Sequence, residues 1–190
     1  EPNIYSVELL KSFVKMVEQN GLHEFPIHLK IDTGMNRLGL KTDTEIKMAI
    51  QAIKENRHIK LQSVFSHLAA SDDSEFDNFT LDQIARFEKI ANLISQLIPY
   101  KIERHILNSA GIERFPGKQF EMVRLGIGLY GVSNTGLPLQ NIGTLRSTVS
   151  QVKTVKPSET IGYSRKGEIT KESEIAIVPL GYADGLDRKL

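Results

Sequence analysis

Side chains that can bind anions or transfer protons occur at the carboxyl ends of four predicted strands. In parallel α/β folds, ligands bind beyond these ends. The residues are Lys30, Asp32 and Arg37 on the first strand, His67 on the second, His105, Asn108 and Ser109 on the third, and Arg124, Gly126 and Gly128 on the fourth. We therefore expect a single ligand site assembled from four strand ends.

Arg124 interrupts the apolar run MVRLGIGLYG at residues 122–131. The alternation predicts that Arg124 faces inward with Gly126 and Gly128, while the apolar residues pack against helices; these are Val123, Leu125, Ile127 and Leu129. A buried guanidinium is costly unless it has an acceptor. Two interpretations remain open: a structural salt bridge across the fold, or a ligand contact for which the glycines leave space.

Ser109, Gly126 and Ile127 together offer a hydroxyl and backbone N–H groups, which is a combination that can hold a phosphate. Glycines in such a strand also occur for packing alone, and His67 and His105 at strand ends can be structural. The five histidines show no metal-binding spacing and the chain has no HExxH motif. We therefore expect an anion site without a metal.

Strands and helical patterns alternate through the first two thirds of the chain, which predicts βαβ units and a parallel sheet. Four such units would be half of a (β/α)8 barrel, which needs about 250 residues. Asn20-Gly21 is predicted to end the first helix, and Asp43 or Thr44 to cap the second. The predicted helices are 6–19, 44–56 and 78–98, and the predicted strands are 27–32, 61–68, 102–108 and 122–130.

The first of these strands has one apolar and one polar face. Ile27, Leu29 and Ile31 alternate with polar residues, so we expect them to face the helices; the polar residues are His28, Lys30 and Asp32.

The pattern changes near residue 132, where a Gly/Pro/Asn-rich segment at 133–141 is followed by short β-like runs. The runs are 144–155 and 174–179, with a turn at 162–167. We predict three parts: residues 1–133 as the C-terminal half of a barrel, 134–141 as a linker, and 142–190 as the N-terminal part of a β domain. The chain does not begin with methionine, and no closing element follows its last strand-like run. We therefore expect it to be a piece of a longer protein.

Composition excludes several classes of protein. Of the 190 residues, 40% are hydrophobic and 25% charged, and the net charge is +1, so no basic tract favours nucleic acid. No apolar run approaches the ~20 residues of a membrane span, and no signal peptide is recognisable. The absence of cysteine excludes disulfides and thiolate zinc sites. We expect a cytoplasmic protein that binds neither nucleic acid nor membranes.

Five segments together resemble the alanine racemase family, which is pyridoxal-phosphate-dependent and of fold-type III. They follow the family's order and span essentially the whole chain. The segments are HLKIDTGMNRLGL (28–40), FSHLAASDD (65–73), HILNSAGIERFP (105–116), VRLGIGLYG (123–131) and IVPLGYADGLDR (177–188).

The resemblance implies the second half of a (β/α)8 barrel followed by the start of a C-terminal β domain. It also implies an isomerase that racemises L- and D-alanine for peptidoglycan precursors, working as a head-to-tail homodimer with active sites shared between subunits. The cofactor would be pyridoxal 5'-phosphate.

The resemblance assigns roles around the cofactor. Arg124 matches the arginine that hydrogen-bonds the pyridine nitrogen, and His67 and His105 match the histidines networked to it. The phosphate contacts would be Ser109, Gly126 and Ile127, with Asn108 beside them. An arginine at the pyridine nitrogen disfavours its protonation, which weakens the electron sink and favours simple reprotonation.

Three further residues match family positions nearer the substrate. Arg37 resembles the arginine near the cofactor's phenolic oxygen and the substrate carboxylate, and Lys30 the lysine that some members carry as a carbamate. Tyr182 matches the catalytic tyrosine, which reaches the active site of the partner subunit. Its pKa is ordinarily near 10, so neighbouring groups must assist it as a base.

The family's other base is the Schiff-base lysine on the first barrel strand, and no lysine in this chain matches it. We therefore expect the 190-residue chain to be inactive by itself. Three alternatives remain. The first is a fold-type III amino acid decarboxylase, against which the Gly-Tyr-Ala-Asp-Gly motif argues. The second is a non-catalytic barrel protein that binds the same cofactor, against which the β-like sequence after the linker argues, and the third is a parent protein that has lost activity.

Overall fold

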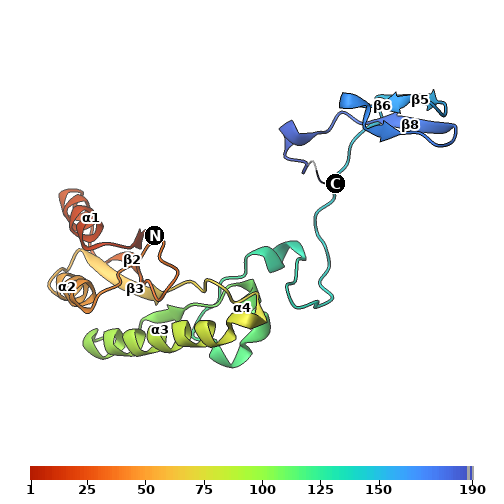
Figure 1. Cartoon of the computed structure of the whole chain (residues 1–190). Coiled ribbons are helices and arrows are strands. Elements are labelled where there is room, and N and C mark those ends of the chain that lie inside the picture. The colour runs from red at the N-terminus through yellow and green to blue at the C-terminus, as the bar shows by residue number, and fades with distance from the viewer. Residues whose placement is uncertain (188, 190) are drawn as a thin grey trace. The chain divides into compact units, whose positions relative to one another are not determined.

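The computed structural model describes residues 1–187 and residue 189, and divides into two units, Glu1–Ile142 and Gly143–Leu190. The first unit holds a parallel sheet with helices, and the second holds short antiparallel strands (Figure 1). None of the described helices is both long and apolar enough to cross a membrane.

The sheet of the first unit has four parallel strands in the order of the sequence. They are β1 (Asn3–Ile4), β2 (Phe25–Lys30), β3 (Ile59–Phe65) and β4 (Glu103–His105). Sequential order without a reversal is the arrangement of a barrel, whereas a doubly wound open sheet reverses its order. The predicted parallel βαβ arrangement is therefore confirmed.

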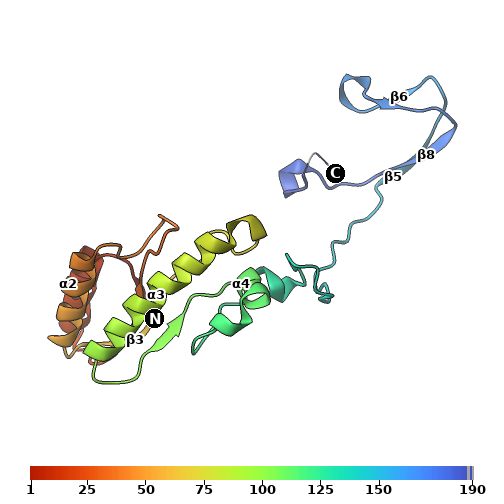
Figure 2. The ribbon, with the colours of Figure 1, turned by 60° about the horizontal axis from the view of Figure 1, so that its bottom comes forward.

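The helices between these strands agree with the predicted ranges to within two residues. They are α1 (Val7–Gln19), α2 (Asp43–Lys54) and α3 (Asp77–Leu97). Figure 1 and Figure 2 show α1 and α2 side by side. The 3₁₀ turn η1 (Ser74–Phe76) precedes α3. A short helix, α4 (Ser109–Arg114), follows β4, and the 3₁₀ turns η2 (Pro116–Lys118) and η3 (Ile127–Tyr130) come after it.

Local hydrogen bonds explain where α1 ends and where α2 begins. Gly21 is left-handed, with φ of 65°, and Leu22 N–H donates to Val17 O, so the predicted stop at Asn20-Gly21 is confirmed. The predicted cap of α2 at Asp43 or Thr44 is wrong. Thr42 is the cap, because its hydroxyl accepts the Glu45 N–H while the Glu45 carboxylate accepts the Thr42 N–H.

The core lies between one face of the sheet and the helices. Ile27, Leu29 and Ile31 are at most 1% exposed, which confirms the predicted alternation of the β2 strand. They belong to one cluster with the buried apolar residues of α1, α2 and α3. Burying each such side chain stabilises the fold by about 1.5–3 kcal/mol. Because these residues take up one face of β2, His28 and Lys30 lie on the opposite face, where they are available for chemistry.

The predicted strand at 122–130 is wrong, and β1 was not predicted. Residues 122–126 do run beside β4, with Met122 N–H donating to Arg104 O at 3.3 Å and Arg124 N–H to Leu107 O at 3.0 Å. The chain then turns into η3, because the Ser109 hydroxyl accepts the N–H groups that a strand ladder would use.

The expected packing of the 122–130 segment also differs. Val123 packs against the core, but the next three apolar residues are at least half exposed, and these are Leu125, Ile127 and Leu129.

The second unit contains two small antiparallel sheets. One pairs β5 (Gln151–Val155) with β8 (Ser173–Ile177), and the other pairs β6 (Thr160–Ile161) with β7 (Gly167–Glu168). The turns are η4 (Tyr163–Arg165) and η5 (Tyr182–Asp184). Among the described residues of 143–190 no side chain is buried. This unit therefore owes little of its structure to a core of its own.

Candidate functional site

The guanidinium of Arg124 joins the carboxyl ends of β3 and β4. It donates to Nδ1 of His105 at 2.5 Å and to Nδ1 of His67 at 3.1 Å. It also donates to the backbone carbonyls of Ser66 at 2.5 Å, and of His105 and Ile106 at 3.3 Å each. The predicted grouping of Arg124 with the two histidines is therefore present in the structure.

The segment that carries Arg124 is fastened to β4 by a forked ion pair. Arg104 Nε and Nη2 donate to the Glu121 carboxylate at 2.9 and 2.7 Å, and the Arg104 guanidinium lies 5.0 Å from the Phe120 ring centroid. This pairing lowers the pKa of Glu121 to about 2, first through the side-chain hydrogen bond with Arg104. The pair holds the backbone three residues before Arg124.

All described hydrogen-bond partners of Arg124 are neutral, and no described ion pair contains it. Burial lowers the pKa of Arg124 to about 10, so it stays charged at neutral pH. Burial, followed by the Arg124 charge, lowers the pKa of both His67 and His105 to about 4, so both rings accept its N–H groups in the neutral form. The first interpretation of Arg124, a structural salt bridge, is therefore not supported, because no described acidic side chain pairs with it.

Two other cations add to the positive potential at this end of the sheet. The charge of Lys30 contributes to the lowered pKa of His67, and so does that of Arg37. The pKa of Lys30 is itself lowered, first by burial and then by Arg37 and Arg124. The site therefore gathers three positive groups around two neutral imidazoles, an arrangement that favours an anionic ligand.

A second cluster forms where α4 begins. The Ser109 hydroxyl accepts the N–H groups of Gly126 at 2.9 Å and Gly128 at 3.1 Å. Asn108 is the helix cap, because its Oδ1 accepts the Gly111 N–H at 2.9 Å and also the Ser71 hydroxyl at 2.8 Å. Ile127 begins η3, between the two glycines. The structure thus brings the three predicted phosphate contacts, Ser109, Gly126 and Ile127, to one turn with Asn108 beside them.

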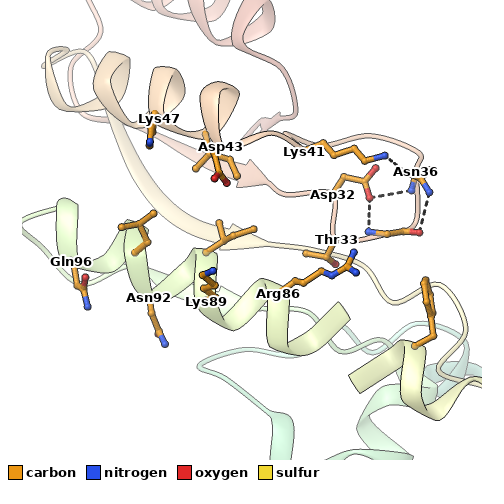
Figure 3. A pocket seen from close by; sticks show the side chains of 15 residues that line it. Asp32, Thr33, Asn36, Lys41, Asp43, Lys47, Arg86, Lys89, Asn92 and Gln96 are labelled. Atoms are coloured by element: carbon orange, nitrogen blue, oxygen red, sulfur yellow. Dashed lines mark hydrogen bonds between the residues drawn. The ribbon is translucent and has the colours of Figure 1, made fainter. Parts of the chain in front are cut away.

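Arg37 lies in the loop between β2 and α2, and its side chain is exposed. Asp32 Oδ1 organises this loop by accepting the N–H groups of Gly34 at 2.9 Å and Asn36 at 3.1 Å (Figure 3). Leu40 closes the loop, since its N–H donates to Lys30 O and its carbonyl accepts from Asp32 N–H, each at 2.9 Å. The loop is therefore an ordered support for Arg37.

Tyr182 belongs to the second unit, where it begins η5 and is 71% exposed. The motif that contains it was predicted to run to Arg188, which lies outside the described residues.

Sequence reasoning missed Phe65 and Ser63 on the inner face of β3. The Phe65 ring stacks on His105 with centroids 5.0 Å apart, and the Arg124 guanidinium lies 5.3 Å from its centroid. The Ser63 hydroxyl contacts the His28 and His105 rings. The available signal was the alternation of these two residues about Val64, which is buried on the core side.

A groove of about 930 Å³ lies between α2 and α3 (Figure 3). Its lining includes Asp43 and Lys47 of α2 and Arg86 and Lys89 of α3, but neither Arg124 nor any residue of the two clusters above. Among the described residues no group of three or more potential metal ligands occurs. We therefore place the candidate site at the strand ends and not in the groove.

Family comparisons agree with this arrangement. Residues 1–134 match the model of the alanine racemase N-terminal domain, and residues 142–190 that of the alanine racemase C-terminal domain. Alanine racemase 1 of Bacillus subtilis is 36% identical over 193 residues, covering 98% of this chain and 48% of the relative. The alanine racemase of Fusobacterium nucleatum is 43% identical over 169 residues, covering 86% and 46%.

Solved structures give the same result. The alanine racemase of Streptomyces coelicolor superposes with a TM-score of 0.89 at 26% identity, covering 98% of this chain and 51% of that one. The Bartonella henselae enzyme with covalently bound pyridoxal phosphate gives 0.77 at 27% identity, covering 100% and 51%.

The chain spans about half the length of the relatives it matches. Its fold is the second half of a (β/α)8 barrel followed by the start of a C-terminal β domain. With both family models matched in order along its length, the chain belongs to the alanine racemase family.

Proposed function

We propose that this chain is part of a pyridoxal-phosphate-dependent enzyme that interconverts L- and D-alanine in the cytoplasm and supplies D-alanine to peptidoglycan synthesis. The observation that carries the proposal is the Arg124 guanidinium, held between two neutral histidines at the strand ends. The names of the relatives support the same activity.

The residues at the turn after β4 fit the phosphate of this cofactor. Ser109 supplies a hydroxyl whose oxygen accepts the backbone N–H groups of Gly126 and Gly128. A bound phosphate oxygen would replace the Ser109 oxygen as acceptor of the Gly126 N–H, and the Ser109 hydroxyl would donate to the phosphate. A Cβ added to Gly126 would lie 3.6 Å from Ser109 Oγ, so glycine keeps the space beside the hydroxyl open. We propose that Ser109, Gly126 and Ile127 bind the phosphate and that Asn108 holds Ser109 in place by capping α4.

Pyridoxal phosphate, when bound, supplies an electron sink for the carbanion formed at the substrate Cα. We propose that Arg124 donates a hydrogen bond to the pyridine nitrogen and does not protonate it, since a guanidinium with a pKa of about 10 remains charged at neutral pH. His67 and His105 hold this guanidinium in orientation. A nitrogen left unprotonated weakens the sink, which favours return of the proton to Cα over transamination.

Two residues of the first unit are proposed to orient the substrate. The exposed guanidinium of Arg37 binds the carboxylate, and the ordered loop supports it. The charge of Arg37 contributes to the lowered pKa of Lys30, which raises the fraction of free amine; that amine can add carbon dioxide and release a proton to form a carbamate. A carbamate would bear a negative charge and attract Arg37.

We propose that Tyr182 removes or returns the Cα proton in the active site of a partner subunit of a homodimer. The opposite face of Cα would then be served by the Schiff-base lysine, which we place outside this chain. We also propose that residues 1–133 form the barrel half, 134–141 the linker and 142–190 the β domain. The Glu113 carboxylate supports that boundary, because it accepts from Ser133 Oγ at 2.8 Å and Thr135 Oγ1 at 2.5 Å and so anchors the start of the linker.

The test is an alanine racemisation assay in both directions with added cofactor, on the intact parent protein and on the 190-residue chain. We expect activity in the parent and none in the chain. In the parent, Tyr182→Phe should lower kcat by about 100-fold or more, because proton transfer by a positioned group contributes that much.

Tyr163→Phe is the matched control, because Tyr163 belongs to the same unit and is 94% exposed; it should keep the parent's kcat. Carbon dioxide release in place of racemisation would support the decarboxylase alternative, and equal kcat values for both variants would remove Tyr182 from the mechanism.

A further inference from the structure

Ser63 is fully buried on the inner face of β3, with its hydroxyl between two imidazole rings. Its Oγ lies 3.0 Å from Nε2 of His105 and 2.6 Å from Nδ1 of His28. His28 Nε2 in turn lies 2.7 Å from the Glu1 carboxylate. A continuous line of hydrogen bonds therefore runs from Arg124 through β4 and β3 to β2.

The direction of every hydrogen bond in this line is set by its arginine end. Arg124 has only N–H donors, so His105 Nδ1 must accept and the proton of the neutral ring sits on Nε2. That N–H donates to Ser63 Oγ, and the Ser63 hydroxyl donates to His28 Nδ1. Because His28 Nδ1 accepts, the ring proton of His28 sits on Nε2 and is donated to the Glu1 carboxylate.

The His105 ring has two stable settings about its last side-chain torsion, related by a half-turn. Stacking on Phe65, with the planes 4° apart, fixes the plane of the ring but not which setting it takes. A half-turn would put carbon atoms where Nδ1 meets Arg124 and where Nε2 meets Ser63. The Ser63 hydroxyl thus adds a second hydrogen bond to the setting that serves Arg124.

We propose that Ser63 is a positioning residue that selects the His105 ring setting and proton position needed to hold Arg124, with His28 orienting the Ser63 hydroxyl. This proposal rests on the proposed function for its effect on catalysis. Ser63 touches neither substrate nor cofactor in this scheme and acts through His105.

The first test is independent of catalysis and uses ¹⁵N NMR of the histidine rings in the 190-residue chain. Wild type should show His105 and His28 each protonated on Nε2. Ser63→Ala should speed exchange of the His105 Nε2 proton with water about tenfold, the usual scale of one lost neutral hydrogen bond. The same change should move the His28 nitrogens toward a mixture of tautomers.

His28→Asn and His28→Leu provide a matched pair of similar size. The Asn oxygen lies near the position of Nδ1 and can accept from Ser63, while Leu cannot. His28→Asn should keep the slow exchange of the His105 proton, and His28→Leu should lose it. Unchanged His28 and His105 nitrogens in Ser63→Ala would overturn the proposal.

The second test measures racemisation by the intact parent with cofactor. Ser63→Ala should lower kcat about tenfold and change KM by less than about twofold, because His105 then holds Arg124 less firmly. Thr80→Val removes another fully buried hydroxyl, in α3 and outside this line, and should leave kcat unchanged.

Unchanged kcat in Ser63→Ala would overturn the positioning role. Absence of racemisation in the wild-type parent would instead defeat the proposed function, and the NMR comparison would still decide the hydrogen-bond line.

Discussion

At the scale of single residues, the site depends on two histidines that remain neutral beside a charged arginine. An imidazole with a proton on Nε2 can accept at Nδ1, and only this form suits Arg124. Burial makes the charged form of each ring costly, and the arginine adds repulsion. Acid should therefore disrupt the same contacts that position Arg124.

The first prediction concerns this pH dependence. The pKa of His67 and His105 is about 4 in the folded chain against 6.5 when unfolded, so the unfolded state binds more protons in between. Stability is then full above about pH 6.5 and falls as the pH drops toward 4. We expect about 1 kcal/mol less unfolding free energy per histidine at pH 5 than at pH 7, allowing for solvent screening.

Urea unfolding at several pH values, with NMR titration of both rings, would measure this. His67→Asn should lessen the loss between pH 7 and pH 5. Ring titration near pH 6.5 for both histidines would contradict the prediction.

A second prediction concerns Thr80, whose buried hydroxyl has no hydrogen-bond partner among the described residues. Thr80→Val replaces it with a methyl group of similar size, so the desolvation cost disappears. The unfolding free energy should rise by about 1 kcal/mol. Thr42→Val is the contrasting variant, because the Thr42 hydroxyl caps α2, and its loss should lower stability by about 1 kcal/mol. Denaturant melts that moved both variants in the same direction would speak against this account.

At the scale of elements, strands and loops share the placement of the reactive groups, since Lys30 and His105 are the last residues of β2 and β4. The loop after β2 carries Arg37, and the turn after β4 carries Ser109 opposite two glycine N–H groups. The strands supply a common edge, and side-chain hydrogen bonds shape the loops and turns beyond it. Changes in these loops should therefore damage the site before they damage the sheet.

The third prediction tests the loop after β2. Gly39 has φ of 136°, and an added Cβ would lie 2.6 Å from the Asp32 backbone nitrogen. Gly39→Ala should therefore break the closure between Leu40 and Lys30 and cost about 2 kcal/mol or more.

Gly117→Ala is the control, since its Cβ meets nothing within 4 Å, and its effect should stay within about 0.5 kcal/mol. Equal melting temperatures for the two variants would show that the loop tolerates the displacement.

At the scale of the whole chain, the two units differ in how they are held together. The first has a buried cluster that joins the helices and the strands. The second has paired strands, but none of its described side chains is buried. Isolated two-stranded sheets are marginally stable in water, so the second unit should need contacts beyond those described.

The fourth prediction concerns this contrast. In the 190-residue chain, amides of β5 and β8 should exchange with deuterium about a hundredfold or more faster than those of β2 and β3. Hydrogen-exchange mass spectrometry measures both sets in one sample. Deleting residues 143–190 should leave the exchange of β2 and β3 unchanged, whereas comparable protection in the two units would contradict the prediction.

Local sequence determined much of this protein. Apolar periodicity located α1, α2 and α3, and the alternation about Leu29 assigned the two faces of β2, because both depend on neighbours within a few residues. The order of five family segments was enough to indicate the alanine racemase family. Arg124 and its two histidines were also named from sequence, through the family resemblance.

The tertiary structure alone decided how those residues are connected. Ser109 draws in the N–H groups of Gly126 and Gly128, which turns a predicted strand into η3, and Ser63 joins His28 to His105. These hydrogen bonds link residues 17 to 42 positions apart. Residue periodicity carries no record of such pairings, because they exist only once parallel strands have brought distant carboxyl ends to one edge of the sheet.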